Sequence, residues 1–224
     1  MWLWSRAVVA VAVWFSPLAA SAEAPPVAPS PSGELVTDAS ADVELGEYVR
    51  LSEEIERLAL KNAWPGVERT FVQLLETGVH PGFDDWLRGA QAARTRGDLA
   101  AVRERLAAAN ALREDPAVLD WLWDIDSRYG PVSLRCDPGS FLTLDVDATP
   151  MDPDLQRAIA FGRAAIHRDC AFDGLLPIGE YRLYDRVVAV TPRAVAAVDL
   201  RGLEIDARRR RSLRRAWAAE DAGG

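Results

Sequence analysis

The sequence predicts an α+β protein, in which an N-terminal antiparallel array of helices is followed by a small antiparallel sheet covered by one helix. Two observations predict this class. From residue 43 to residue 128, apolar residues recur every three to four positions, which is the period of an amphipathic helix. From residue 129 to residue 200, apolar and polar residues alternate in short runs that are typical of half-buried strands, and a single helical segment interrupts them.

Residues 1–22 have the pattern of a secretory signal. A single Arg6 precedes an apolar run from Ala7 to Phe15, and small residues of the A-x-A type follow at 20–22. The run is shorter than the ~20 residues that a membrane-spanning helix needs. We therefore expect an exported chain, periplasmic or extracellular, that does not span a membrane after cleavage; a retained, uncleaved anchor is the alternative.

Residues 23–42, EAPPVAPSPSGELVTDASAD, form a spacer that is rich in proline, alanine and serine. Its few large apolar side chains cannot offset the entropy cost of ordering the backbone, so we expect it to lack fixed structure.

Five helices are expected next, joined by short turns, in the domain of residues 43–128. Each has an apolar stripe on one face, and turn or capping residues mark the boundaries: Gly78 stops the second helix, Gly97 separates the third from the fourth, and Asp115 caps the fifth. The expected helices cover residues 43–62, 65–77, 83–96, a segment beginning at Leu99, and a segment beginning at Pro116 with the stripe Val118, Leu119, Leu122 and Ile125.

The third and fourth helices, WLRGAQAARTRGDLAAVRERLAAANALREDP, resemble a tetratricopeptide repeat. Trp86 and Ala90 fall at the early tryptophan and the small packing position of that family, and Gly97 falls at its inter-helix turn. Pro116 comes about two residues later than the terminal proline of the pattern. The resemblance implies a scaffold that binds proteins and performs no chemistry of its own; a plain helical bundle would share some of these residues.

The domain of residues 129–200 should be a small α+β module. We expect PVSLRC and FLTLDVDA to form a hairpin around the turn DPGS, a helix to follow from Asp152-Pro153 to Asp169, and EYRLY and RVVAVT to form a second hairpin, with AVAAVDL as a further strand. The segments GPVSLRCDPGSFLTLD and LLPIGEYRLY resemble the short β-modules called PEGA domains of bacterial envelope proteins, although the inserted helix departs from that pattern.

Two cysteines, Cys136 and Cys170, occur in a chain with an export signal. An even, minimal number of cysteines in an oxidising compartment favours one disulfide, which here would join the helix to the sheet. Two buried free thiols are the alternative.

Net charge and composition further limit the classes of function that the chain could have. The net charge of −8 argues against general binding to nucleic acid, and the scarcity of lysine with abundant alanine and arginine suggests a high-GC bacterial source. The tail at 201–224 is basic, with an apolar pair, Leu213 and Trp217, at helical spacing. It could bind an anionic envelope polymer, acidic lipid headgroups or acidic segments of this protein, or be a solvated helix; its arginines are Arg208, Arg209, Arg210, Arg211, Arg214 and Arg215.

The sharpest catalytic motif is Asp145-Val146-Asp147-Ala148-Thr149, which resembles the D-x-D-x-T signature of haloacid-dehalogenase-like phosphatases. That resemblance implies a nucleophilic Asp145 and an acid/base Asp147. The sole lysine lies upstream, and no βαβ pattern follows the motif, so alternating polar positions on a strand are the simpler interpretation. The acidic series that continues to Asp152 and Asp154 could bind calcium, but capping of the helix explains Asp152 more simply. We therefore expect no catalytic residue, metal or cofactor.

Three tryptophans are candidate binding residues: Trp86, Trp121 and Trp123. Trp121 and Trp123 are two apart on a helix, about 200° round its axis, so they cannot share a face. One of them should lie at the edge of the array, either against the β-module or in a groove for a partner. The leading hypothesis is an exported, non-enzymatic bacterial envelope protein that acts as an interaction scaffold for a protein or peptide.

Overall fold

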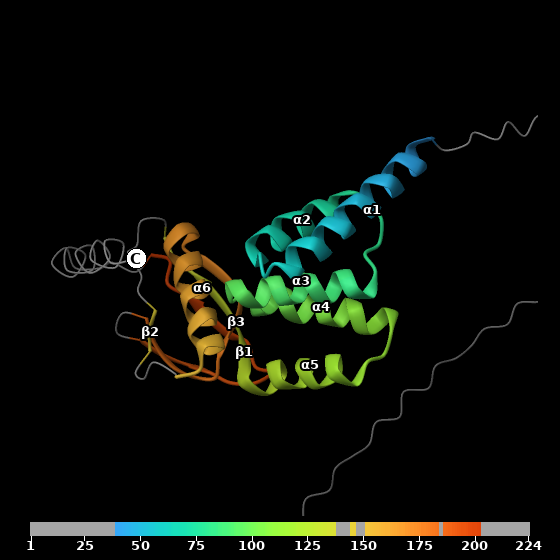
Figure 1. The fold of residues 1–224 in the computed structure, drawn as a ribbon. Helices are drawn as coiled ribbons and strands as arrows, with labels where there is room; N and C mark the ends of the chain where they lie inside the picture. The colour runs from blue at the N-terminus through green and yellow to red at the C-terminus, as the bar shows by residue number, and fades with distance from the viewer. Residues whose placement is uncertain (1–38, 138–143, 147–150, 184–185, 203–224) are drawn as a thin grey trace, which may run out of the picture. The chain divides into compact units, whose positions relative to one another are not determined.

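The computed structural model describes residues 39–137, 144–146, 151–183 and 186–202. The predicted signal peptide, nearly all of the spacer, parts of the D-x-D-x-T segment and the Arg-rich tail lie outside these residues. The described part divides into a run of helices followed by strands with one further helix, and the predicted α+β class is confirmed (Figure 1).

The first half of the described chain is an array of five helices, each packed against the next, with α1 also contacting α3. The predicted boundaries agree with the observed ones within a few residues, and α1 begins four residues before the expected start. The helices are α1 (Ala39–Leu60), α2 (Trp64–Glu76), α3 (Phe83–Arg96), α4 (Leu99–Leu112) and α5 (Pro116–Arg128).

Local capping explains these boundaries. Gly97 ends α3 with a left-handed φ of 84°, which glycine adopts without strain. Asp98 then begins α4 by accepting a hydrogen bond from the backbone N–H of Ala101 at 3.1 Å. Asp115 caps α5 in the same way, accepting from Ala117 N at 2.9 Å, as predicted.

Two apolar cores hold the array together. The first joins α1, α2 and the outer side of α3, and the second joins α3, α4 and α5. Small residues let these helices approach closely, since a Cβ added at Gly89 would overlap the ring of Phe71. The fully buried members include Ile55, Val67, Phe71 and Leu74 in the first core, and Ala90, Ala93, Val102 and Leu106 in the second.

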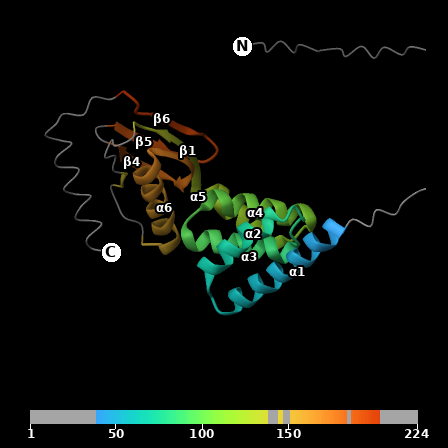
Figure 2. The same ribbon diagram turned by 90° about the horizontal axis from the view of Figure 1, so that it is seen from above.

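The second half consists of strands and one helix. Two three-stranded sheets have the orders β3-β1-β6 and β2-β4-β5, and α6 packs on β3. Figure 2 shows α6 beside the strands of this module. The elements are β1 (Tyr129–Arg135), β2 (Asp145–Val146), α6 (Pro153–Asp169), β3 (Ala171–Pro177), β4 (Gly179–Leu183), β5 (Arg186–Val190) and β6 (Ala196–Asp199).

The pairing of strands differs from the prediction in two respects. The expected hairpin of β1 with β2 is wrong, because β1 pairs with β3 and β6 while β2 pairs with β4. The expected purely antiparallel arrangement is also wrong for one pair, since β6 runs parallel to β1. The predicted hairpin of β4 with β5 is confirmed, with Tyr181 opposite Val188.

One core fills the space between α6 and the strands. Ile159 and Ile166 of α6 pack with alternate residues of the strands, including Leu134, Leu176 and Leu183. The hydroxyl of Tyr181 is buried in this core and donates to the carbonyl oxygen of Pro177 at 2.8 Å, so its polar atom is satisfied.

The array and the β-module share structural elements. No loop separates α5 from β1, and Tyr129, the first residue of β1, is buried in the second core of the array. Ala158 of α6 belongs to the same core, and the Arg94 guanidinium of α3 forms an ion pair with Asp154 of α6. A side chain at Gly97 would collide with the backbone of α6, so α3 and α6 are in close contact.

Candidate functional site

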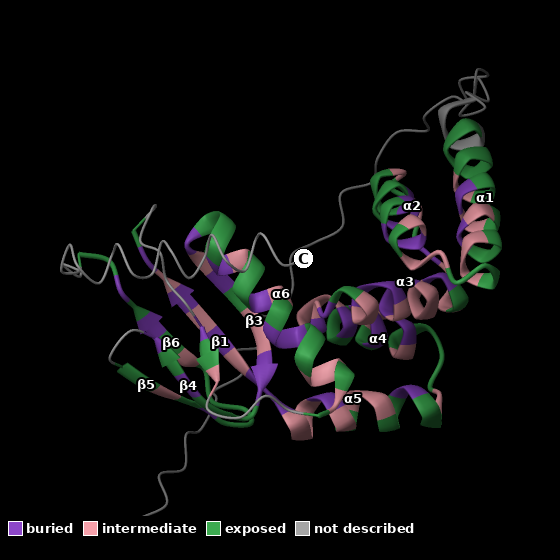
Figure 3. Ribbon diagram, turned by 60° about the vertical axis from the view of Figure 1, so that its left-hand side comes forward, coloured by how far each residue is buried: buried purple, intermediate pink, exposed green. Residues whose placement is uncertain are grey.

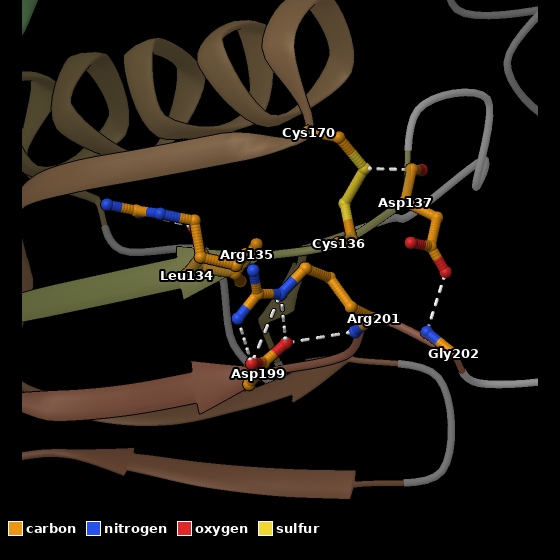
Figure 4. The surroundings of a disulfide bond; sticks show 8 residues. All are labelled: Leu134, Arg135, Cys136, Asp137, Cys170, Asp199, Arg201 and Gly202. Carbon is orange, nitrogen blue, oxygen red and sulfur yellow. Dashed lines mark hydrogen bonds and ion pairs between the residues drawn. A yellow bond between two sulfur atoms is a disulfide. The ribbon is translucent and has the colours of Figure 1, made fainter.

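The predicted disulfide between Cys136 and Cys170 is present, with Cα atoms 5.1 Å apart (Figure 4). It joins the end of β1 to the residue that ends α6, and Cys136 N donates to Cys170 O at 2.8 Å. Beside it, the Asp137 carboxylate accepts from Gly202 N at 2.7 Å, as Figure 4 shows. The bridge is a structural clamp on the β-module, and it is compatible with an oxidising, exported location.

A groove of about 350 Å³ on the helical array is the best candidate for a binding site. It is formed by the first residue of α2, one face of α3 and the first half of α5. Its lining residues are Trp64, Leu87, Arg88, Gln91, Asp115, Ala117, Val118 and Trp121. Because most of this lining is apolar and aromatic, the groove suits an apolar or aromatic side chain of a ligand.

Local sequence explains why these side chains meet. Leu87 and Gln91 are four residues apart on α3, and Val118 and Trp121 are three apart on α5, so each pair lies on one helix face. Trp64 is the first residue of α2, and Pro65 follows it in the first turn of the helix.

Two polar side chains line this groove: Arg88, which forms only long ion pairs, and Gln91. The Arg88 guanidinium lies 3.5 Å from Glu56 Oε1 and 3.8 Å from Asp85 Oδ1, distances that are too long for hydrogen bonds. The Gln91 amide has no hydrogen-bond partner among the described residues. Unused donors beside an apolar surface can fix the orientation of a bound peptide.

Asp85, beside the groove, is by contrast fully occupied. It is buried and accepts hydrogen bonds from Tyr48 Oη at 2.9 Å, Ser52 Oγ at 2.8 Å and Gly82 N at 3.3 Å. Burial and the bond to this carboxylate raise the pKa of Tyr48. Asp85 therefore ties α1 to the start of α3 and is not free to bind a ligand.

The three predicted tryptophans take different positions. Trp121 lines the groove, and the guanidinium carbon of Arg94 lies 5.4 Å from its ring centroid. Trp86 packs edge-to-face on Phe71, with centroids 5.4 Å apart, and belongs to the first core of the array. Trp123 is 72% exposed, so the expectation that Trp121 and Trp123 lie on different faces is confirmed.

The other sequence candidates form no site within the described residues. Asp145 is exposed on β2, whereas Asp147 and all six tail arginines lie outside the described residues. Asp152 caps α6 through Asp154 N at 2.8 Å. The described residues contain no group of three or more histidine, cysteine, aspartate or glutamate side chains that could hold a metal.

Sequence reasoning identified Trp121 as a binding candidate but missed the other seven groove residues: Trp64, Leu87, Arg88, Gln91, Asp115, Ala117 and Val118. The four-residue spacing of Leu87 and Gln91 could have indicated that both lie on the same face of the third helix. The meeting of α3 with α5 and with the start of α2 depends on tertiary packing, which no local pattern shows.

None of the described helices has both the length and the apolar character that crossing a membrane requires. Comparison with protein-family models, with curated proteins and with solved structures gives no match to this chain. The inference about function therefore rests on the groove and on the chemistry of its residues.

Proposed function

We propose that this chain is an exported, non-enzymatic interaction protein whose helical array holds a peptide segment of a partner protein. The observation that carries the proposal is the groove between α3, α5 and the start of α2, which is lined by two indoles, further apolar side chains, the Gln91 amide and the Arg88 guanidinium. Trp64, Arg88 and Trp121 are half-buried, and tryptophan and arginine side chains are typical of the residues that dominate binding energy at protein interfaces.

The resemblance to a tetratricopeptide repeat supports this proposal. The helices follow one another as antiparallel neighbours, and small residues such as Gly89 and Ala90 lie at close helix contacts, as such arrays require. Most of the groove lining comes from α3 and α5, with Trp64 at the start of α2 completing it.

The lining residues of the groove all belong to the helical array, and the β-module supports one of them from behind. Its α6 supplies Asp154, which pairs with the same Arg94 that covers the ring of Trp121. The PEGA-like module would thus position one wall of the groove from behind, and its disulfide fits the proposed export of the chain.

A peptide-display experiment tests the proposal. Peptides are selected from a random library on the intact protein, and the Kd of a labelled, selected peptide is then measured by fluorescence anisotropy. Trp121→Ala and Arg88→Ala should each weaken binding at least ~10-fold, because interface tryptophan and arginine contacts are typically worth more than ~1 kcal/mol.

Trp123→Ala is the matched control, since it removes the same ring from the same helix but from the exposed face. Its Kd should equal that of the unaltered protein. Failure to select any peptide, or equal binding by the Arg88→Ala protein with an unchanged circular-dichroism spectrum, would contradict the proposal.

A further inference from the structure

The outer face of α5 carries an apolar pair that its own fold leaves exposed. Leu119 and Trp123, four residues apart, are 41% and 72% exposed, although Val118 and Ile125 on the opposite face are buried. Figure 3 shows exposed residues along this helix. Leu119 and Trp123 together form an exposed apolar patch, and tryptophan is enriched at protein contact surfaces.

The structure repeatedly uses arginine to cover aromatic rings. Within the described residues, four guanidinium groups lie over rings at 3.6–5.8 Å from the centroid, and each of the four also forms an ion pair with a carboxylate. The pairs are Arg94 with Trp121 and Asp154, Arg96 with Phe161 and Glu68, Arg105 with Phe71 and Glu68, and Arg113 with Phe83 and Asp115.

Trp123 supplies an aromatic ring with carboxylates nearby on the same helix, but no guanidinium of the described residues covers this ring. Asp120 and Asp126 lie three residues before and after it, which places both beside the indole on the helix surface. Asp126 is bound by Arg103 at 2.7 Å, whereas Asp120 is exposed. No arginine of the described residues lies over the ring of Trp123. A guanidinium stacked on this indole and paired with Asp120 would complete the arrangement seen at the other four rings.

We propose that this face of α5 binds the Arg-rich segment at 208–217 of a second copy of the chain. The segment RRRRSLRRAW holds six arginines, and in a helix its Leu213 and Trp217 would form an apolar pair with the same four-residue spacing as Leu119 and Trp123. The two faces are therefore complementary both in charge and in the spacing of their apolar residues.

The length of the chain favours a second copy over the same chain. Gly202 is bonded to Asp137, beyond the far end of β1, whereas α5 ends where β1 begins. Residues 129–137 span about 26 Å at ~3.3 Å per residue, and Trp123 lies about 9 Å further along α5, six residues before Tyr129. Residues 203–207 extended, followed by a helix as far as Leu213, reach only about 26 Å. The segment is too short to lie along its own α5 as a helix, and binding between copies is head-to-tail.

Sedimentation equilibrium of the full chain over a concentration series tests whether the tail of one copy binds α5 of another. The weight-average mass should rise with concentration at low salt, and the association should weaken as salt screens the ion pairs. Trp123→Ala, Asp120→Arg and the double variant Arg214→Glu/Arg215→Glu should each raise the Kd of association between copies at least ~10-fold. Combining Asp120→Arg with the tail variant should restore part of the affinity.

Two variants serve as controls, because they change exposed residues on α1: Leu60→Ala and Glu53→Arg. Both should associate like the unaltered chain. A chain that stays monomeric at every concentration would overturn the proposal. This holds even if its own tail covers Trp123, because the proposal requires contact between two copies. The proposal would also be overturned if the tail variant abolished association while Trp123→Ala left it unchanged. The arginines would then bind an acidic surface other than this face of α5.

Discussion

The ion pair of Glu68 with Arg105 is buried between α2, α3 and α4, and replacing one partner should destabilise the array strongly. Arg105 donates to both carboxylate oxygens of Glu68, at 2.6 and 2.9 Å, and to the carbonyl oxygen of Gly89 at 2.7 Å. Its guanidinium also lies 4.6 Å from the ring centroid of Phe71. The perturbations are Glu68→Leu, Arg105→Met and the double variant.

The expected magnitudes differ because the partners left behind differ. After Glu68→Leu, the buried Arg105 keeps only a carbonyl and a ring, and an uncompensated buried charge costs about 3–5 kcal/mol. After Arg105→Met, Glu68 keeps the half-exposed Arg96 at 3.2 Å, so we expect the lower cost of ~2–3 kcal/mol. The double variant leaves Arg96 paired with Asp98 alone and fills the site with apolar groups, and it should cost no more than ~2 kcal/mol.

Urea unfolding followed by circular dichroism at 222 nm measures these free energies. The double-variant cycle should give a coupling energy of at least ~2 kcal/mol. Glu47→Leu is the control, because Glu47 pairs with Arg50 on the exposed surface of α1 and should change stability by less than ~0.5 kcal/mol. The reasoning is refuted if Glu68→Leu costs no more than this control, or if the costs of the single variants add in the double variant.

Three further predictions concern stability. Replacing Cys136 and Cys170 by alanine should lower the free energy of unfolding by ~3–4 kcal/mol, the chain-entropy value for cysteines 34 residues apart; an unchanged urea midpoint would contradict it. Gly97→Ala should cost ~2–4 kcal/mol, because it adds a collision with the α6 backbone to the left-handed φ, whereas Gly78→Ala, with a φ of 76° and open space, should cost only ~1 kcal/mol. If Gly97→Ala and Gly78→Ala lowered the free energy of unfolding equally, the close contact between Gly97 and α6 would be absent. Burial raises the pKa of Tyr129 to about 12, above its unfolded value near 10, so stability should fall as the pH rises from ~10 to ~12. Tyr129→Phe should make the free energy of unfolding fall less steeply over this pH range. A fall as steep as that of the unaltered chain would contradict the prediction.

Helix boundaries could be predicted closely because the residues that set them act locally. Gly97 and Asp115 end or begin helices through their own backbone angle or side chain, independently of distant contacts. The burial of single positions was harder to predict. Leu119 was expected in the stripe of α5 but is 41% exposed, because the array does not continue with a further helix on that side within the described residues.

Strand pairing and the groove could not be predicted from local patterns. Alternation identified β1 and β6 as strands, but it carries no information about which strand pairs with which. The parallel pair of Val132 with Ala196 joins residues far apart in the chain. The groove likewise depends on the packing of three helices, so only Trp121 among its residues could be suspected from the sequence.

The direct passage of α5 into β1 has a consequence for synthesis. A ribosome delivers the chain from its N-terminus, and each helix of the array finds a packing neighbour in the segment made just before or after it. β1 is the central strand of its sheet, yet β3 begins only at Ala171 and β6 at Ala196. The helices can therefore assemble early on the nascent chain, while β1 waits for both neighbours and Cys136 stays a thiol until Cys170 has been made.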